Sequence, residues 1–227
     1  MERSTDNRKV PGPNPGRPTF FFRVKKKMVK RIFLVRHGET VANELNLIQG
    51  VTDSALSKKG VEQAKSLSKY FQDESVNAVY CSDLGRTKQT LELSGIPKKP
   101  GVRIVFSSAI RERNYGKLEN RAYVSIKPPE SDFLFHSNAK PDGGESIEDL
   151  GKRITPFFET LLKENGGGET VVIVTHHNVV VTMLCHLLGL PFEKWRLFKC
   201  GNASVSELVF EDGMWRIKTV NDSCHFG

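Results

Sequence analysis

The sequence predicts an α/β fold, a three-layer α/β/α sandwich around a mostly parallel central sheet. Three observations lead to this prediction. Short apolar runs of strand length alternate with segments whose apolar residues recur at helical spacing. Most of these runs are rich in β-branched residues, as buried parallel strands are. The chain has 227 residues and is 38% hydrophobic, which is enough for one sizeable core.

The first half of the chain is expected to form three strands and two helices. Residues 32–35 are apolar and indicate a buried strand, and Ser57 is a plausible N-cap for the helix that follows. That helix is predicted because apolar residues recur at helical spacing at Val61, Ala64, Leu67, Tyr70 and Phe71. A second strand at 78–80, a helix at 86–93 and a third strand at 102–106 are expected next.

The second half continues the alternation and ends in a hairpin. Ser146 and Asp149 resemble a capping box for a helix that runs through Leu162, in which Pro156 is expected to cause a bend. The glycines at 166–168 end this helix, and a buried strand is predicted at 170–174. A helix at 179–188 follows, and two strands at 204–210 and 214–220 are expected to pair as a hairpin.

The net charge of +8 is concentrated at the N-terminus. Residues 1–30 carry nine Lys or Arg against Glu2 and Asp6, so the remaining residues are nearly neutral, with 25 basic against 24 acidic groups. A nucleic-acid binder is therefore disfavoured, since it needs a cationic face. Residues 1–28, rich in proline and glycine, are expected to be a flexible basic extension, with a targeting peptide or a functional basic arm as alternatives, and residues 29–227 a single domain.

Two further features concern location. No apolar segment is long enough to predict a membrane span, so no membrane partner is expected. The four cysteines show no metal-ligand spacing and are expected to be reduced thiols, which indicates a cytoplasmic protein.

Polar residues follow each of the four predicted parallel strands. They are Arg36-His37-Gly38, Ser82 to Thr87, Arg111-Glu112-Arg113 and Thr175-His176-His177-Asn178. The carboxyl ends of parallel strands share one edge, so we expect the four junctions to form one pocket. Arginine forks and a helix N-terminus suit a phosphate, histidine can attack phosphorus, and a carboxyl group can protonate a departing alcohol.

Each of these residues also has a structural alternative. Arg86 could lie on a helix surface, Glu112 could pair with a neighbouring arginine, and His176 could be a core histidine. A zinc site formed by His176, His177 and His186 is disfavoured, because adjacent ligands rarely suit tetrahedral geometry. His225 is left without an assigned role.

Residues 30–227 resemble the histidine phosphatase superfamily, also called the phosphoglycerate mutase-like family. The resemblance rests on a set of motifs in a fixed order: Arg36-His37-Gly38-Glu39-Thr40, Leu56-Ser57 with Gly60, Ser82 to Thr87, Arg111-Glu112-Arg113, Gly144-Glu145-Ser146 and Thr175-His176. It implies a phosphoglycerate mutase-like fold and an enzyme that needs neither a metal nor another cofactor.

The resemblance also implies a role for each site residue. His37 becomes transiently phosphorylated, while Arg36, Arg86 and His176 hold the phosphoryl oxygens. Glu112 corresponds to the family's proton donor, and Asn43 adds a phosphate contact. The remaining predicted residues line the substrate pocket: Gln49, Gly50, His177 and Asn178.

Three activities remain open within this resemblance. The favoured one is a metal-independent phosphatase that acts on small phosphorylated metabolites, as a monomer or homodimer. The alternative is a cofactor-dependent phosphoglycerate mutase, which would grip a second phosphate; Arg121, Lys127 and Lys140 are the basic candidates for that grip. The third is a catalytically silent binding protein. Asn120 and the pair His177-Asn178 replace glycines that are common in such phosphatases, and this leaves the substrate open.

Overall fold

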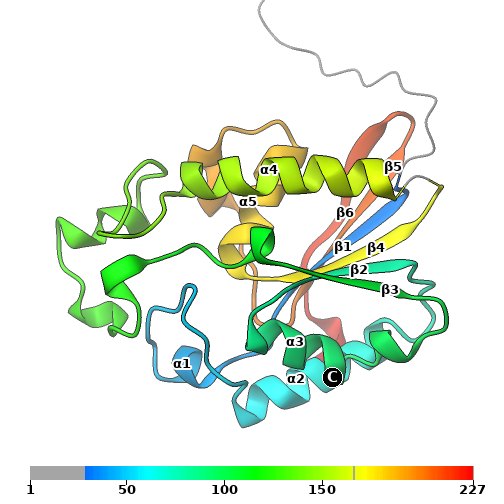
Figure 1. Cartoon of the computed structure of the whole chain (residues 1–227), viewed down its shortest axis with the longest axis horizontal. Helices are drawn as coiled ribbons and strands as arrows, with labels where there is room; N and C mark the ends of the chain where they lie inside the picture. The colour runs from blue at the N-terminus through cyan, green and yellow to red at the C-terminus, as the bar shows by residue number, and fades with distance from the viewer. Residues whose placement is uncertain (1–28, 166, 227) are drawn as a thin grey trace, which may run out of the picture.

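Six strands form one sheet between two layers of helices (Figure 1). The computed structural model describes residues 29–165 and 167–226, so the expected extension at 1–28 lies outside the described residues. The strands are β1 (Arg31–Arg36), β2 (Ala78–Ser82), β3 (Arg103–Ser107), β4 (Thr170–Thr175), β5 (Val205–Glu211) and β6 (Met214–Asp222). The helices are α1 (Val41–Glu44), α2 (Lys58–Tyr70), α3 (Gly85–Leu93), α4 (Ile147–Glu164) and α5 (His177–Leu187).

The strand order is β3-β2-β4-β1-β5-β6, and the first four of these strands are parallel. β5 pairs antiparallel with β1, and β6 pairs antiparallel with β5, as expected for the predicted hairpin. The predicted mostly parallel sheet and three-layer arrangement are therefore confirmed. Because β1, β2, β3 and β4 run in one direction, their carboxyl ends lie along one edge of the sheet.

Alternate residues of the central strands supply two separate cores. Ile32 and Leu34 of β1 face α4 and α5, where they pack with Ile154 and Phe158. Phe33 and Val35 face α2 and α3, where they pack with residues such as Leu67, Phe71 and Leu91. Burial on both faces explains why β1 and β4 read as continuous apolar runs instead of alternating ones.

Side-chain caps define the starts of two predicted helices. The Ser57 hydroxyl accepts a hydrogen bond from the Gly60 N–H at 3.1 Å and begins α2. Ser146 and Asp149 form the predicted capping box at the start of α4. α4 continues through Pro156 to Glu164, so the proline does not end it. These caps satisfy N–H groups that have no partner inside the helix.

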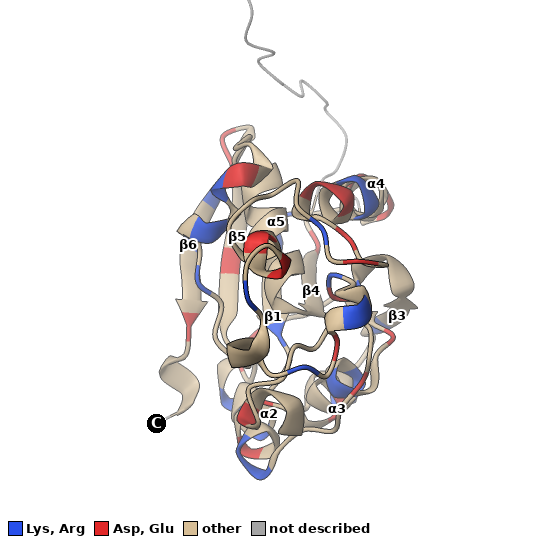
Figure 2. Cartoon of the chain, turned by 90° about the vertical axis from the view of Figure 1, so that its left-hand side faces the viewer, with Lys and Arg blue, Asp and Glu red and all other residues tan. Residues whose placement is uncertain are grey.

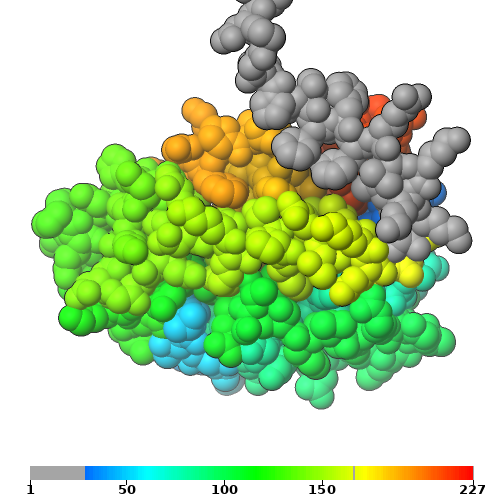
Figure 3. All heavy atoms as spheres, turned by 45° about the horizontal axis from the view of Figure 1, so that its top comes forward, coloured from blue at the N-terminus to red at the C-terminus, as the bar shows by residue number. Residues whose placement is uncertain are grey.

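The segment before α4 is built from short 3₁₀ helices and forms the left-hand end of the molecule (Figure 3). The 3₁₀ helices of the described chain are η1 (Ile96–Lys98), η2 (Ser108–Ile110), η3 (Gly116–Leu118), η4 (Tyr123–Ser125), η5 (Glu130–Leu134), η6 (Phe192–Leu197) and η7 (Cys224–Phe226). Within the described residues, no helix has the length and apolar character needed to span a membrane.

Candidate active site

The four predicted junctions meet at the carboxyl edge of the sheet. The rings of His37, after β1, and His176, after β4, stand edge to face with their centroids 5.2 Å apart. Ser82 at the end of β2 contacts the His176 ring, and the Thr175 hydroxyl donates to the Ile110 carbonyl after β3 at 2.7 Å. Figure 2 looks onto the side of the molecule to which these strand ends point, and shows basic and acidic residues interspersed there.

His37 is held with one ring nitrogen occupied and the other free to react. Its Nδ1 lies 2.7 Å from the Gly38 carbonyl oxygen, which can only accept, so Nδ1 carries the proton and Nε2 does not. The side chain is 3% exposed. Burial, together with the positive charges of Arg86 and Arg36, holds the pKa of His37 well below its usual value. An unprotonated Nε2 is the form that a nucleophile requires.

His176 lies between Arg86 and Ser82. The Arg86 Nε–H donates to His176 Nδ1 at 3.3 Å, and His176 Nε2 lies 2.8 Å from the Ser82 hydroxyl. His176 is fully buried, and burial and the nearby Arg86 hold its pKa well below the usual value. Because the Arg86 Nε–H can only donate, Nδ1 is the acceptor, and the neutral His176 ring carries its proton on Nε2, from which it donates to the Ser82 hydroxyl.

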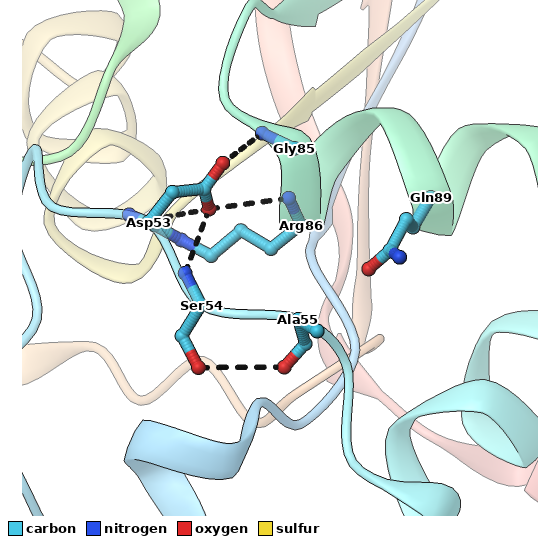
Figure 4. Close-up of a pocket in the computed structure, with 6 residues that line it drawn as sticks. All are labelled: Asp53, Ser54, Ala55, Gly85, Arg86 and Gln89. Carbon is cyan, nitrogen blue, oxygen red and sulfur yellow. Dashed lines mark hydrogen bonds and ion pairs between the residues drawn. The ribbon is translucent and has the colours of Figure 1, made fainter.

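Arg86 lies in the first turn of α3 and is 1% exposed. Its guanidinium donates to the carbonyls of Gly50 at 2.6 Å and Thr52 at 3.1 Å, and it pairs with Asp53 at 3.2 Å. The Asp53 carboxylate also accepts from the Gly85 and Arg86 N–H groups, which places an acceptor at the N-terminus of α3 (Figure 4). This carboxylate compensates the buried charge of Arg86 and replaces the side-chain cap that Leu84 cannot provide.

The depression beside these residues is separate from the histidine pair. It has a volume of about 290 Å³ and is lined by Asp53, Ser54, Ala55, Gly85, Arg86 and Gln89 (Figure 4). Since Arg86 also contacts His176, its side chain separates this depression from the two histidines.

Arg36 and His177 both donate to one backbone carbonyl. Arg36 Nη1 lies 2.7 Å and His177 Nδ1 lies 3.1 Å from the Cys200 oxygen. Arg36 Nε is buried and has no hydrogen-bond partner among the described residues. Burial and the charge of Arg36 lower the pKa of His177. Arg36 therefore retains a donor for an anion at the site.

Glu112 is buried at the N-terminus of α5. One carboxylate oxygen accepts from the Arg113 N–H at 2.8 Å, and the other accepts from the Asn178 N–H at 3.4 Å. The Asn178 side chain donates to the Tyr115 hydroxyl at 2.8 Å, so it is occupied by the protein. Arg153 of α4 donates to the Glu112 carbonyl at 3.2 Å and fixes the backbone of this loop.

Asn43, Gln49 and Gly50 lie around the same site. The Asn43 Oδ1 accepts from the Thr40 N–H at 3.2 Å and from Asn202 Nδ2 at 3.1 Å, which leaves its own amide N–H groups for a ligand. The Gln49 Oε1 accepts from the Thr40 hydroxyl at 2.8 Å, while its buried Nε2 has no partner within the described chain. Gly50 is required by space, because a Cβ there would lie 2.3 Å from a Glu119 oxygen.

Several residues that organise the site carry no role in the sequence prediction. Asp53 and Glu119 hold the loop that carries Gly50, Ser82 contacts His176, and Asn202 donates to the His37 carbonyl at 3.3 Å. Ser82 belongs to the motif from Ser82 to Thr87 that follows a predicted strand, so its position in the sequence already indicated that it lies near the site. The others act through contacts between segments that are distant in sequence, for which the sequence offers no local pattern.

The disfavoured zinc alternative finds no support in the described residues, which contain no group of three or more His, Cys, Asp or Glu placed to hold a metal ion. His186 packs its ring against Phe158 of α4, with centroids 6.0 Å apart. It therefore lies against the core and not beside His176 and His177.

Comparisons with known proteins agree with this geometry. The model of the family described as histidine phosphatase superfamily (branch 1) matches residues 32–223. A protein of Yersinia pestis named probable phosphoglycerate mutase GpmB is 32% identical over 205 residues, covering 86% of this chain and 94% of that protein.

Solved structures are similar as well. Bacillus stearothermophilus YhfR is 26% identical, with a TM-score of 0.79, over 87% of this chain and 99% of that one. A mycobacterial glucosyl-3-phosphoglycerate phosphatase in complex with VO3 is 25% identical, with a TM-score of 0.76, over 85% of this chain and 99% of that one.

Proposed function

Because the chain belongs to branch 1 of the histidine phosphatase superfamily, we propose that it is a phosphatase that hydrolyses small phosphate monoesters through a phosphohistidine on His37. The observation that carries this proposal is the His37 ring itself. Its Nδ1–H is bound to the Gly38 carbonyl, which leaves an unprotonated Nε2 beside His176 and Arg86. Attack on phosphorus requires this tautomer.

In the first step, His37 Nε2 forms a bond to phosphorus while the bond from phosphorus to the ester oxygen breaks. Glu112 gives its proton to the departing alkoxide, which leaves as a neutral alcohol. Arg36 and Arg86 offset the charge of the phosphoryl oxygens. The unpartnered Nε of Arg36 supports this role, since it is a buried donor without an acceptor in the described chain.

In the second step, the Glu112 carboxylate takes a proton from water as the water oxygen attacks phosphorus. The bond between phosphorus and Nε2 breaks, which releases inorganic phosphate and restores His37. His176 assists by donating from Nδ1 to a phosphoryl oxygen. For this, the Arg86 Nε–H that donates to Nδ1 must turn to the phosphate, and the His176 proton must move from Nε2 to Nδ1. Ser82 supports this exchange, because its hydroxyl can then donate to the vacated Nε2.

Phosphatase activity is favoured over mutase activity because two of the three basic candidates for gripping a second phosphate, Arg121 and Lys140, lie beside carboxylates. A mutase needs cations for a second phosphate, but the guanidinium of Arg121 is paired with both oxygens of Glu130, and Lys140 lies 3.8 Å from Asp149. The mutase nevertheless stays the second candidate, because the Yersinia relative is named a probable phosphoglycerate mutase. A cytoplasmic location remains a prediction that rests on the cysteine pattern.

A panel of phosphorylated metabolites, assayed for phosphate release with and without bisphosphoglycerate, tests the proposal. We expect phosphate release without bisphosphoglycerate. The rate of this release should fall by at least about 10³-fold in His37→Ala. Acid-labile phosphate should be trapped on the wild-type chain and be missing from His37→Ala. His136→Ala is the matched control, because this exposed histidine lies outside the site and should keep full activity.

Two results would count against the phosphatase. Isomerisation of 3-phosphoglycerate that depends on bisphosphoglycerate, without net phosphate release, would establish the mutase instead. If no monoester in the panel left phosphate on His37, the catalytically silent alternative would be favoured.

A further inference from the structure

The loop that precedes β5 holds the backbone of His37. The His37 carbonyl oxygen accepts from the Ala203 N–H at 3.0 Å and from Asn202 Nδ2 at 3.3 Å. On its other side, the His37 N–H donates to the Thr175 carbonyl at 3.0 Å. The position of the nucleophile's backbone therefore depends on where Ala203 lies.

Ala203 has a left-handed backbone, with φ at +51°. A residue with a Cβ pays on the order of 1–2 kcal/mol for this conformation, so it persists only where neighbouring contacts enforce it. Ala203 is fully buried, and hydrogen bonds engage both its N–H and its carbonyl. A side chain from a distant segment holds this carbonyl.

That group is His225 in η7, near the end of the chain. Its Nε2 lies 3.1 Å from the Ala203 oxygen, which can only accept, so Nε2 carries the proton. The imidazole is 6% exposed and stands edge to face against Tyr70 of α2, with centroids 5.5 Å apart. A second contact from the same end of the chain is the Asn221 Oδ1, which accepts from the Gly201 N–H at 2.6 Å.

The surroundings favour the neutral form of His225. Its Nδ1 is buried without a partner among the described residues, and burial lowers the pKa of the ring below its usual value. The charged groups that act on this ring and its neighbour Tyr70 come from β5 and β6, namely Glu207 and Asp222. A neutral imidazole has one N–H and can donate one hydrogen bond. In His225 this hydrogen bond goes to the Ala203 carbonyl oxygen.

We propose that His225 is a positioning residue for the nucleophile: its Nε2–H fixes the Ala203 carbonyl, and the Ala203 N–H in turn fixes the His37 carbonyl. The inference rests on the proposed function of His37. It gives the C-terminal segment a role in the reaction, although that segment supplies no group to the substrate. Small displacements of a reacting group are costly, since about 1 Å can reduce a rate by about 10²-fold.

The test compares His225→Phe, which keeps a ring but loses the donor, with His225→Gln, whose Nε2 can replace the lost N–H. We expect His225→Phe to slow phosphate release by about 10- to 100-fold with an unchanged KM. It should also weaken inhibition by orthovanadate, which must be placed against His37 Nε2, but not inhibition by inorganic phosphate. His225→Gln should restore both the rate and the vanadate inhibition.

The ratio of the inhibition constants of orthovanadate and inorganic phosphate distinguishes an effect on positioning from an effect on stability. An unfolded fraction of the enzyme changes neither constant. His186→Phe is the matched control, since this ring packs against Phe158 away from the site and should leave the ratio unchanged. If His225→Phe fails to fold, the ratio of inhibition constants is measured for His225→Gln and Asn221→Ala instead. We expect Asn221→Ala to weaken inhibition by orthovanadate but not by phosphate. His225→Gln should give the wild-type ratio.

A wild-type rate and a wild-type ratio in His225→Phe would overturn the inference while leaving the phosphatase intact. An equal loss in His225→Phe and His225→Gln would also overturn it, because the N–H would then not be the group that matters. By contrast, a wild-type chain that releases no phosphate from any monoester would overturn the proposed function itself, and the inference with it.

Discussion

At the scale of single residues, Glu119 links the loop at residues 50–52 to the backbone of Tyr115. Its carboxylate accepts from the N–H groups of Val51, Thr52 and Tyr115, and Gly50, which follows Gln49, is packed against one of its oxygens. The loop that carries Gln49 and Gly50 therefore depends on one side chain. Because Arg86 donates to the Gly50 carbonyl, displacement of this loop should also affect the proposed phosphate site.

We expect Glu119→Ala to lower the free energy of unfolding by about 1–3 kcal/mol, since three backbone donors lose their acceptor. Phosphatase activity should fall as well, because the Gly50 loop is released. Urea unfolding and kcat/KM measure the two effects.

Glu130→Ala is the matched control for this prediction. Glu130 is 52% exposed and pairs with Arg121 at the surface, and such pairs contribute about 0–1 kcal/mol. Equal effects of the two substitutions would show that Glu119 has no special part in holding the loop.

The sequence predicted which site residues lie at the strand ends, but not which groups contact them. His37, Arg86 and His176 were expected together because parallel strands share an edge, and the structure brings them together. Asn120 illustrates the opposite case. It replaces a glycine common in such phosphatases, and its φ of +65° is a conformation that asparagine tolerates better than most residues. The substitution is thus compatible with the same turn, which a sequence without coordinates does not reveal.

At the scale of elements, the packing of the His37 loop against α2 depends on two facing glycines. A Cβ at Gly38 would lie 2.5 Å from the Gly60 oxygen, and a Cβ at Gly60 would lie 1.8 Å from the Glu39 oxygen. The obstructing atoms are backbone, so they cannot rotate away. The loop and the first turn of α2 can approach each other only because neither residue carries a side chain.

Gly60→Ala should therefore destabilise the protein by about 3 kcal/mol or more and reduce activity, since the strain falls beside His37, the proposed nucleophile. Thermal unfolding and phosphate release are the measurements. Gly167→Ala is the control, because no atom that the structure describes beyond its chain neighbours lies within 4 Å of a Cβ at that position, and the substitution should change stability by about 0.5 kcal/mol at most. A stable and active Gly60→Ala protein would contradict the described approach.

The longer elements were predictable because periodicity and caps act locally. The predicted strands at 32–35 and 170–174 lie within β1 and β4, and the Ser146 capping box starts α4 as expected. The helix α1 and the 3₁₀ helices between β3 and α4 were not predicted. α1 begins with a local capping box of Thr40 and Asn43, but its four residues are too few to show an apolar period. The 3₁₀ helices depend on distant groups, as when the Tyr123 N–H at the start of η4 donates to the Asn46 carbonyl at 3.1 Å.

At the scale of the whole molecule, buried neutral histidines make stability depend on pH. The folded pKa values of His37 and His176 lie well below 6.5, and burial is the main cause for both. As pH falls through the unfolded pKa near 6.5, the unfolded chain takes up protons that the folded chain does not. Stability contributed by the neutral rings is thus present at higher pH and is lost as pH decreases.

We expect the free energy of unfolding to fall between pH 7.5 and pH 5.5, with a slope of up to about 1.4 kcal/mol per pH unit for each histidine below its unfolded pKa. Urea unfolding across this range gives the slope. His37→Gln should reduce the slope by the contribution of about one proton. Substitution of the exposed His136 by Gln should leave the slope close to that of the wild type. A flat profile would show that the buried rings take up protons over the same pH range in the folded and unfolded chains, so that their pKa values are not lowered by folding.

The strand order has a consequence for synthesis on the ribosome. β1 is made first among the strands and carries His37 at its end, yet its two neighbours in the sheet are β4, which begins at residue 170, and β5, which begins at residue 205. While most of the chain is translated, His37 therefore lies at the end of a strand that has neither of its neighbours in the sheet. The unpaired strand exposes apolar side chains, which favour chaperone binding. The sheet is complete only when β5 and β6, which ends at Asp222, have left the ribosome, so one edge of β1 stays unpaired until β5 is available.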